Sequence, residues 1–177
     1  MPEAKRIGSY LSPMKQNSTS PESESLVRPE HVVKLFARMK HLYGHKWASV
    51  YGSATDAVGL SLSARQWLYD LRDMTPEQVA LGVAETERRG LEWPPGPIEF
   101  KRLCMGIPSL EQLLDRSTDY GPVCAEIRKR LDWYRIDGMT TENARRLAEQ
   151  QMERSVMAMR QSGELQALAA PVRAIAA

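Results

Sequence analysis

From Pro29 onward, apolar side chains recur at intervals of three and four residues, the spacing that places them on one face of an α-helix. The pattern is clear in the segment that carries Val32, Leu35 and Phe36, and it returns in later segments of the chain. The alternation typical of a half-buried strand is convincing nowhere. The sequence therefore predicts an all-α fold of about seven helices.

Start and stop signals divide this pattern into helices. Thr75, Pro76 and Gln78 provide a cap, a first-turn proline and a capping-box partner, and Gly90 provides a stop after the basic residues that precede it. Signals of the same kind predict helices over residues 29–43, 64–74, 76–89, 97–104, 122–134 and 141–163, a further start at Ser109, an apolar turn at 47–51 and a loop over 52–61.

The stretch RGLEWPPGPIEFKRLC, residues 89–104, interrupts the helical pattern with three prolines. Trp93 should be extended because a residue before proline is pushed out of helical space, and Pro97 can start a short helix. We therefore interpret Trp93, Pro94, Pro97 and Phe100 as a rigid corner between two helices, with Trp93 packed in the core.

The composition changes twice along the chain. Residues 1–28 are rich in Ser, Pro and Glu and lack periodic apolar positions, which predicts a flexible arm. Residues 29–163 form the helical domain in this interpretation. Residues 164–177 form a short, apolar, Ala-rich C-terminal tail.

Several classes of protein are disfavoured by what the sequence lacks. No apolar run approaches the length of a membrane span and the N-terminus lacks a signal-peptide core, so we expect a cytoplasmic protein. Cys104 and Cys124 fit no metal signature and should be inert, partly buried thiols. His41 and His45 have no third ligand nearby, and there is no phosphate-binding loop. We expect no catalytic residue, no metal, no cofactor and no enzyme activity.

Two basic clusters are candidates for nucleic-acid contact. They are Lys101 with Arg102, and Arg128 with Lys129 and Arg130. The alternative is a solvated, charge-balanced surface, because acidic residues lie close to both clusters and the net charge of the chain is only +2.

The last predicted helix and the tail are candidates for binding a protein partner. Flexible thioethers and a short apolar segment suit an adaptable interface, with Met152, Val156, Met159, Leu165 and Leu168 as the contact residues. The alternative is that these side chains complete the core and that the tail frays or packs back on the domain.

Two segments of the chain resemble the replication protein P family of lambda-like bacteriophages and prophages. They are FARMKHLYGHKWASVYG, residues 36–52, and MTPEQVALGVAETERRGLEWPPGPIEFKRLC, residues 74–104, in which the Trp-Pro corner leads into a Phe-x-x-x-Cys helix. GIPSLEQLL and GPVCAEIRKRLDWYRI, at residues 106–114 and 121–136, are similar to the segments that follow in that family. The resemblance covers about residues 34–160.

This resemblance implies a helicase loader without ATPase activity of its own. Such a protein binds the hexameric DnaB-type replicative helicase of the host and delivers it to the phage origin. An origin-binding initiator and single-stranded DNA are further expected partners. Two other functions stay open: a small helical DNA-binding regulator, and a primosome adaptor that binds single-stranded DNA.

Overall fold

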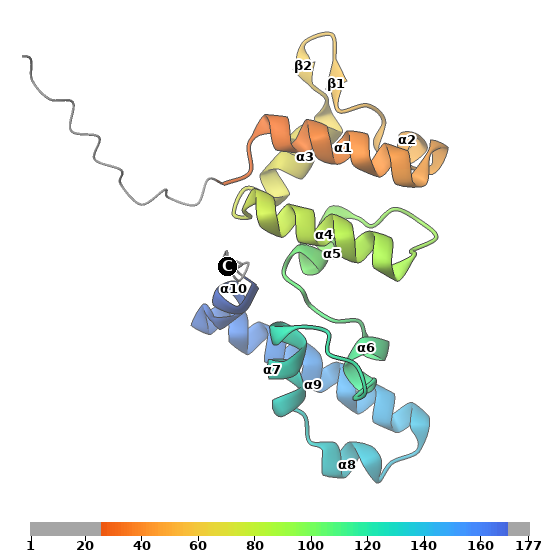
Figure 1. The fold of residues 1–177 in the computed structure, drawn as a ribbon, viewed down its shortest axis with the longest axis vertical. Helices are drawn as coiled ribbons and strands as arrows, with labels where there is room; N and C mark the ends of the chain where they lie inside the picture. Colours follow the sequence, from red (N-terminus) through yellow and green to blue (C-terminus); the bar gives the residue numbers. More distant parts are fainter. Residues whose placement is uncertain (1–25, 170–177) are drawn as a thin grey trace, which may run out of the picture.

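The computed structural model describes residues 26–169, so most of the expected flexible arm, and the end of the expected tail, lie outside the described residues. The fold is all-α, as predicted, with one very small sheet (Figure 1). In chain order, the elements of the described part are α1 (Pro29–Tyr43), α2 (His45–Tyr51), β1 (Thr55–Asp56), β2 (Gly59–Leu60), α3 (Leu62–Asp70), α4 (Pro76–Arg89), α5 (Pro97–Cys104), α6 (Leu110–Leu114), α7 (Pro122–Lys129), α8 (Trp133–Asp137), α9 (Thr141–Ser162) and α10 (Glu164–Ala169).

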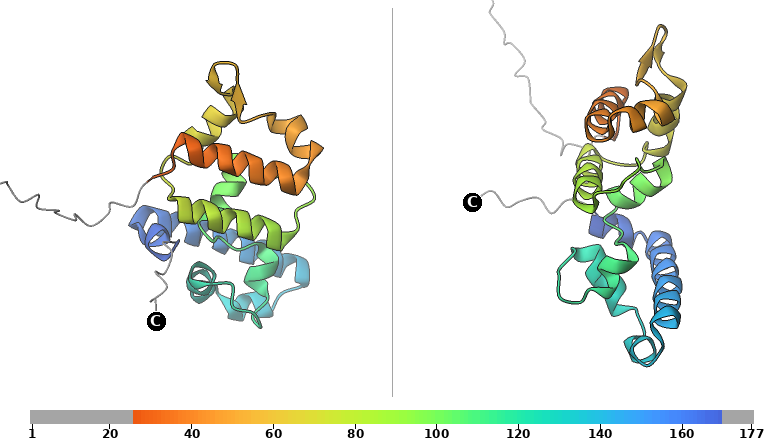
Figure 2. Two further views of the ribbon diagram at one scale, coloured as in Figure 1. Left: turned by 45° about the horizontal axis from the view of Figure 1, so that its top comes forward. Right: turned by 90° about the vertical axis from the view of Figure 1, so that its right-hand side faces the viewer.

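The first half of the fold consists of α1 to α5 and the hairpin of β1 and β2. In both views of Figure 2, α1 and α4 run side by side, and α5 returns along α4. Aromatic side chains fill the space between α1, α2, α3 and α5. Trp47 and Trp67 are almost completely buried there with Phe36 and Phe100, at ring-centroid separations of 5.1–6.0 Å that favour edge-to-face or tilted contacts.

The predicted boundaries of α4 are confirmed by its caps. The Thr75 hydroxyl accepts a hydrogen bond from the Gln78 backbone N–H, and the Gln78 side chain accepts one from the Thr75 N–H, which completes a capping box. Gly90 ends the helix in the left-handed conformation, which costs glycine little because it has no side chain.

The helices α4 and α5 approach each other closely at Gly82. A Cβ atom placed on Gly82 would lie 2.5 Å from Cys104 Sγ and 3.2 Å from the Cys104 backbone nitrogen. Only glycine fits at this position without a shift of its neighbours. The contact buries Cys104 completely, and burial raises the pKa of its thiol, as expected for an inert cysteine.

The second half of the fold is formed by α6 to α9. The long helix α9 buries Ala148, Met152, Val156 and Met159 on one side, which is the side that the spacing predicted. The α10 helix then folds back against α9 and α7.

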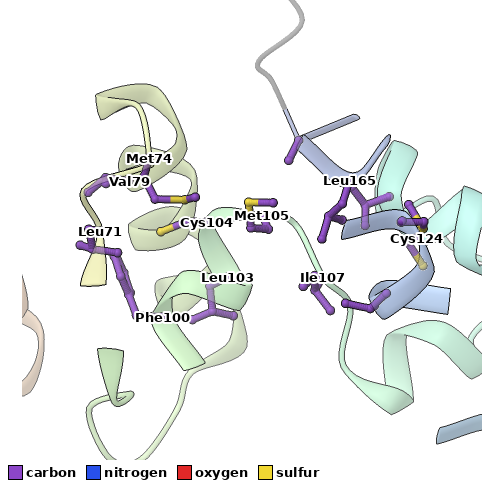
Figure 3. Close-up of a cluster of buried hydrophobic side chains, with 14 of the residues drawn as sticks. Leu71, Met74, Val79, Phe100, Leu103, Cys104, Met105, Ile107, Cys124 and Leu165 are labelled. Carbon is purple, nitrogen blue, oxygen red and sulfur yellow. The ribbon is translucent and has the colours of Figure 1, made fainter. Parts of the chain in front are cut away.

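The junction between the halves is a continuous apolar core. Figure 3 shows Met105 between one group of side chains that includes Met74 and Cys104 and another that includes Ile107 and Leu165. The Gln78 side-chain amide also donates to the Ala169 carbonyl oxygen at 3.5 Å, which links α4 to the end of α10.

Several predictions of local structure are wrong. The described residues contain ten helices where about seven were predicted, and the helix expected over 64–74 is α3, which ends at Asp70. The helix expected over 122–134 is interrupted, because Asp132 caps a new helix by accepting a hydrogen bond from the Arg135 N–H, so Tyr134 is exposed instead of facing inward. In addition, the expected loop over 52–61 contains an antiparallel hairpin that pairs Thr55 with Leu60. None of the helices between residues 26 and 169 combines the length and apolar character needed to cross a membrane.

Replacing Gly82 with alanine tests the contact between α4 and α5. Alanine stabilises a helix interior by about 1 kcal/mol relative to glycine. We nevertheless expect Gly82→Ala to lower the free energy of unfolding by about 1–2 kcal/mol, because overpacking a filled core costs more than this gain. Urea denaturation followed by circular dichroism measures the difference.

Two further variants separate the effect of the close contact from the effect of helix propensity. Gly82→Ala combined with Cys104→Ala removes the clashing sulfur and should show a favourable coupling between the two sites. Ala84→Gly, on the exposed side of α4, should lose only the helix propensity, about 1 kcal/mol. A Gly82→Ala protein as stable as the unmodified chain would contradict the close contact.

Candidate protein-binding cleft

The side chains predicted to contact a partner at the end of the chain are mostly inside the core. Met152, Val156, Met159 and Leu165 are at most 5% exposed, and Leu168 is half-buried. These residues cannot form a contact surface in this conformation, which corrects the prediction and agrees with the alternative that they complete the core. Met157 points outward on the other side of α9 and is 62% exposed.

The basic residues predicted on α5 are engaged by carboxylates of neighbouring elements. Lys101 Nζ lies 2.6 and 2.8 Å from the two carboxylate oxygens of Asp73 and 3.2 Å from the Asp70 carbonyl oxygen. Arg102 donates two hydrogen bonds to Glu153 of α9, at 2.7 and 3.2 Å, and this guanidinium lowers the pKa of the Glu153 carboxyl group. Both side chains therefore connect α5 to other parts of the fold.

Arg128 holds the loop that follows α6. Its guanidinium donates to the carbonyl oxygens of Gln112 at 2.6 Å, Leu113 at 3.1 Å and Thr118 at 3.0 Å, and also to that of Asp115. The planar fork of an arginine can reach several acceptors at once, whereas a lysine ammonium cannot match this geometry. Arg128 is therefore a structural residue in this fold.

The two remaining basic residues are also paired. Lys129 and Arg130 contact Glu126 at 3.1 and 3.2 Å, and Arg130 also contacts Glu164 of α10 at 2.5 Å. All five predicted nucleic-acid contacts thus have acidic or carbonyl partners within the chain. The expectation of a charge-balanced surface describes these residues better than the expectation of a basic patch.

The proline corner is held by α2. Tyr51 donates its hydroxyl hydrogen to the Pro95 carbonyl oxygen at 3.1 Å, and Lys46 Nζ donates to the Glu92 carbonyl oxygen at 2.9 Å. Of the predicted corner residues, Phe100 is fully buried and Pro94 and Pro97 are half-buried.

Trp93, by contrast, is 58% exposed, which corrects the prediction that it packs in the core. Lys46 Nζ lies 4.9 Å from the centroid of its ring, in a cation–π contact. The indole therefore contacts α2 through Lys46 instead of packing in the core.

A cleft of about 460 Å³ lies where the corner helix meets the end of the last long helix. Its walls come from the turn between α3 and α4, from α5, and from the α9–α10 junction. The cleft is lined by Asp70, Asp73, Met74, Pro97, Ile98, Lys101, Met105, Arg160, Leu165 and Gln166. It brings together residues from all three predicted sets: Pro97 from the corner, Lys101 from the basic clusters and Leu165 from the tail.

The cleft combines an apolar surface with charges of both signs. Met74, Met105 and Leu165 are buried and form its apolar part, while Ile98 is 80% exposed at the start of α5. Lys101 is neutralised by Asp73, whereas Arg160 and Asp70 each have no ion pair with any residue between 26 and 169. The arrangement suits an apolar side chain of a protein partner next to a carboxylate that would pair with Arg160.

Sequence reasoning did not identify Ile98 or Arg160 as candidates. Ile98 lies within the short helix predicted from Pro97 and carries no signal of its own, and Arg160 belongs to no cluster of like charges. Among the described residues, no group of three His, Cys, Asp or Glu side chains is placed to hold a metal ion. No family model, curated protein or solved structure matches the chain.

Arg128→Ala tests whether this residue is structural. We expect the free energy of unfolding to fall by about 2–3 kcal/mol, because several carbonyl groups lose a charged donor. Arg128→Lys should recover little of the loss. Thermal and urea unfolding measure the free energy of unfolding of each variant. Retention of the protein on immobilised DNA at low salt should be the same for the variants as for the unmodified chain.

Lys129→Ala is the matched control, since Lys129 is exposed and adjacent in sequence. Its stability should change by less than about 0.5 kcal/mol. If Arg128→Ala kept full stability but lost DNA retention, the structural role would be wrong and a nucleic-acid contact would replace it.

Proposed function

We propose that the chain is a phage or prophage helicase loader, which binds the hexameric DnaB-type replicative helicase of its host and loads it at the origin without ATPase activity of its own. One observation supports this most. The segment with the most telling resemblance to the replication protein P family, residues 74–104, supplies Met74, Pro97, Ile98 and Lys101 to the cleft. The segment that suggests the family and the surface best suited to a protein partner therefore coincide.

Loading requires that the protein bind one state of the helicase more tightly than another. A ligand shifts a conformational equilibrium only by its differential affinity for the two states, so an opened ring must be the better partner. A rigid body serves this purpose because little binding energy is lost in ordering it. The contact at Gly82 and the hydrogen bond from Tyr51 to Pro95 both favour such rigidity around the cleft.

The other proposed partners are less well supported. An origin-binding initiator would bind the N-terminal arm, most of which lies outside the described residues. Single-stranded DNA could stack on exposed aromatic side chains such as Trp93 and Tyr134, which are 58% and 92% exposed. A regulator of duplex DNA is disfavoured because the predicted basic residues are paired within the chain.

Native mass spectrometry of the protein mixed with its host's replicative helicase tests the proposal. We expect several copies of the protein on one hexamer, with a stoichiometry that changes on addition of ATP or single-stranded DNA. Ile98→Glu and Arg160→Glu should each weaken the complex by about tenfold or more, since central contacts dominate interface energies. Both side chains are exposed, so folding should be unaffected.

Val50→Glu is the control, because Val50 is an apolar residue of α2 that is 52% exposed and does not line the cleft. It should bind like the unmodified protein. Absence of any complex, together with retention on single-stranded DNA at low salt, would refute the loader and favour the adaptor. If the complex forms and none of the cleft variants weakens it, the loader proposal stands, but the cleft is not the surface that contacts the helicase.

A further inference from the structure

The β1–β2 hairpin projects from one end of the molecule (Figures 1 and 2). Its turn presents Val58, which at 97% has the highest exposed fraction among the large apolar side chains of the described residues. Leu62, immediately after the hairpin, is 78% exposed. Neither side chain lines the cleft.

The hairpin is held in place by hydrogen bonds at its base and at its turn. The Ser61 hydroxyl donates to the Ser53 carbonyl oxygen at 2.7 Å, and the Ser61 backbone N–H donates to the Ala54 carbonyl oxygen at 2.9 Å. At the turn, the Asp56 carboxylate accepts from the Val58 N–H at 2.9 Å. Val58 is therefore presented by an ordered backbone, which reduces the entropy lost when it binds.

The size of the hairpin limits how it can bind. Its strands contain two residues each, which is too short to add a strand to the sheet of another protein. Contact must therefore be made by the side chains at the tip. Valine and its neighbour Ala57 are small, so a shallow apolar pocket would accommodate them.

The charge of the hairpin favours a protein partner over a nucleic acid or an anionic lipid surface. Asp56 is the only ionisable residue among residues 52–62. Phosphate groups of nucleic acids and anionic lipids would be repelled by it, and no lysine or arginine of this segment could attract them. A protein pocket with a basic residue at its edge complements both the apolar tip and the single negative charge.

We propose that the hairpin is a second docking element, which inserts Val58 into a shallow apolar pocket with a basic edge on the replicative helicase. This inference rests on the proposed function. The hairpin and the cleft are separate surfaces of one fold, so together they would engage the helicase at two points. Two contacts at a fixed distance on one rigid body bind best when the two helicase surfaces have a matching separation. If that separation differs between the closed and the opened ring, the protein binds one state more tightly, as loading requires.

The experiment measures the affinity of full-length variants for the immobilised helicase hexamer by biolayer interferometry. Val58→Asp should weaken binding by about tenfold or more, because a valine that becomes buried in the complex is replaced by a charge. Val58→Ile should retain binding within about threefold, because it keeps the apolar character of the tip. Val50→Asp, on α2, should bind like the unmodified protein, and circular dichroism should show that all variants keep their helix content.

The outcomes separate this inference from the proposed function. If the unmodified protein binds and Val58→Asp binds equally well, the docking role of the hairpin is overturned while the loader proposal stands. If Val50→Asp weakens binding as much as Val58→Asp does, the effect is not specific to the tip and the inference also fails. If the unmodified protein does not bind the helicase, both proposals are overturned.

Discussion

The close approach of α4 and α5 at Gly82 sets the packing of the first half of the fold. Without a side chain at Gly82, the two helices can pack with Cys104 between them, and this brings the proline corner, α2 and the aromatic cluster into contact. The same approach fixes α5 as one wall of the cleft. The absence of a side chain at Gly82 therefore shapes both the core of the first half and one wall of the cleft.

Much of the fold could be predicted from the sequence because its signals are local. The capping box at Thr75, the stop signals at Gly90 and Gly163, and the apolar spacing of α9 all act within a few residues, and the structure has helices at these places. The break between α7 and α8 was missed because the apolar spacing continues through it, while the Asp132 cap interrupts the backbone. The hairpin was missed because strands of two residues leave almost no pattern.

The candidate site was harder to predict because it depends on contacts between distant segments. Sequence alone does not show that Arg102 meets Glu153 or that Arg128 gathers four carbonyl groups, so these residues looked available for nucleic acid. The methionines of α9 looked available for a partner for the same reason. The exposed fraction of a side chain shows whether it is available to a partner or used within the fold. This fraction depends on contacts between distant segments, which the sequence alone does not show.

The position of α10 has a consequence for how the protein is made. Helices α1 to α5 can pack once Cys104 has left the ribosome, but Met105 and Ile107 acquire their apolar neighbour Leu165 only after some sixty further residues have been synthesised. During that interval, the apolar surface at the junction is open to water and to other chains. Apolar surface exposed in this way is the kind that chaperones bind, and the folding back of α10 against α9 and α7 removes it from water.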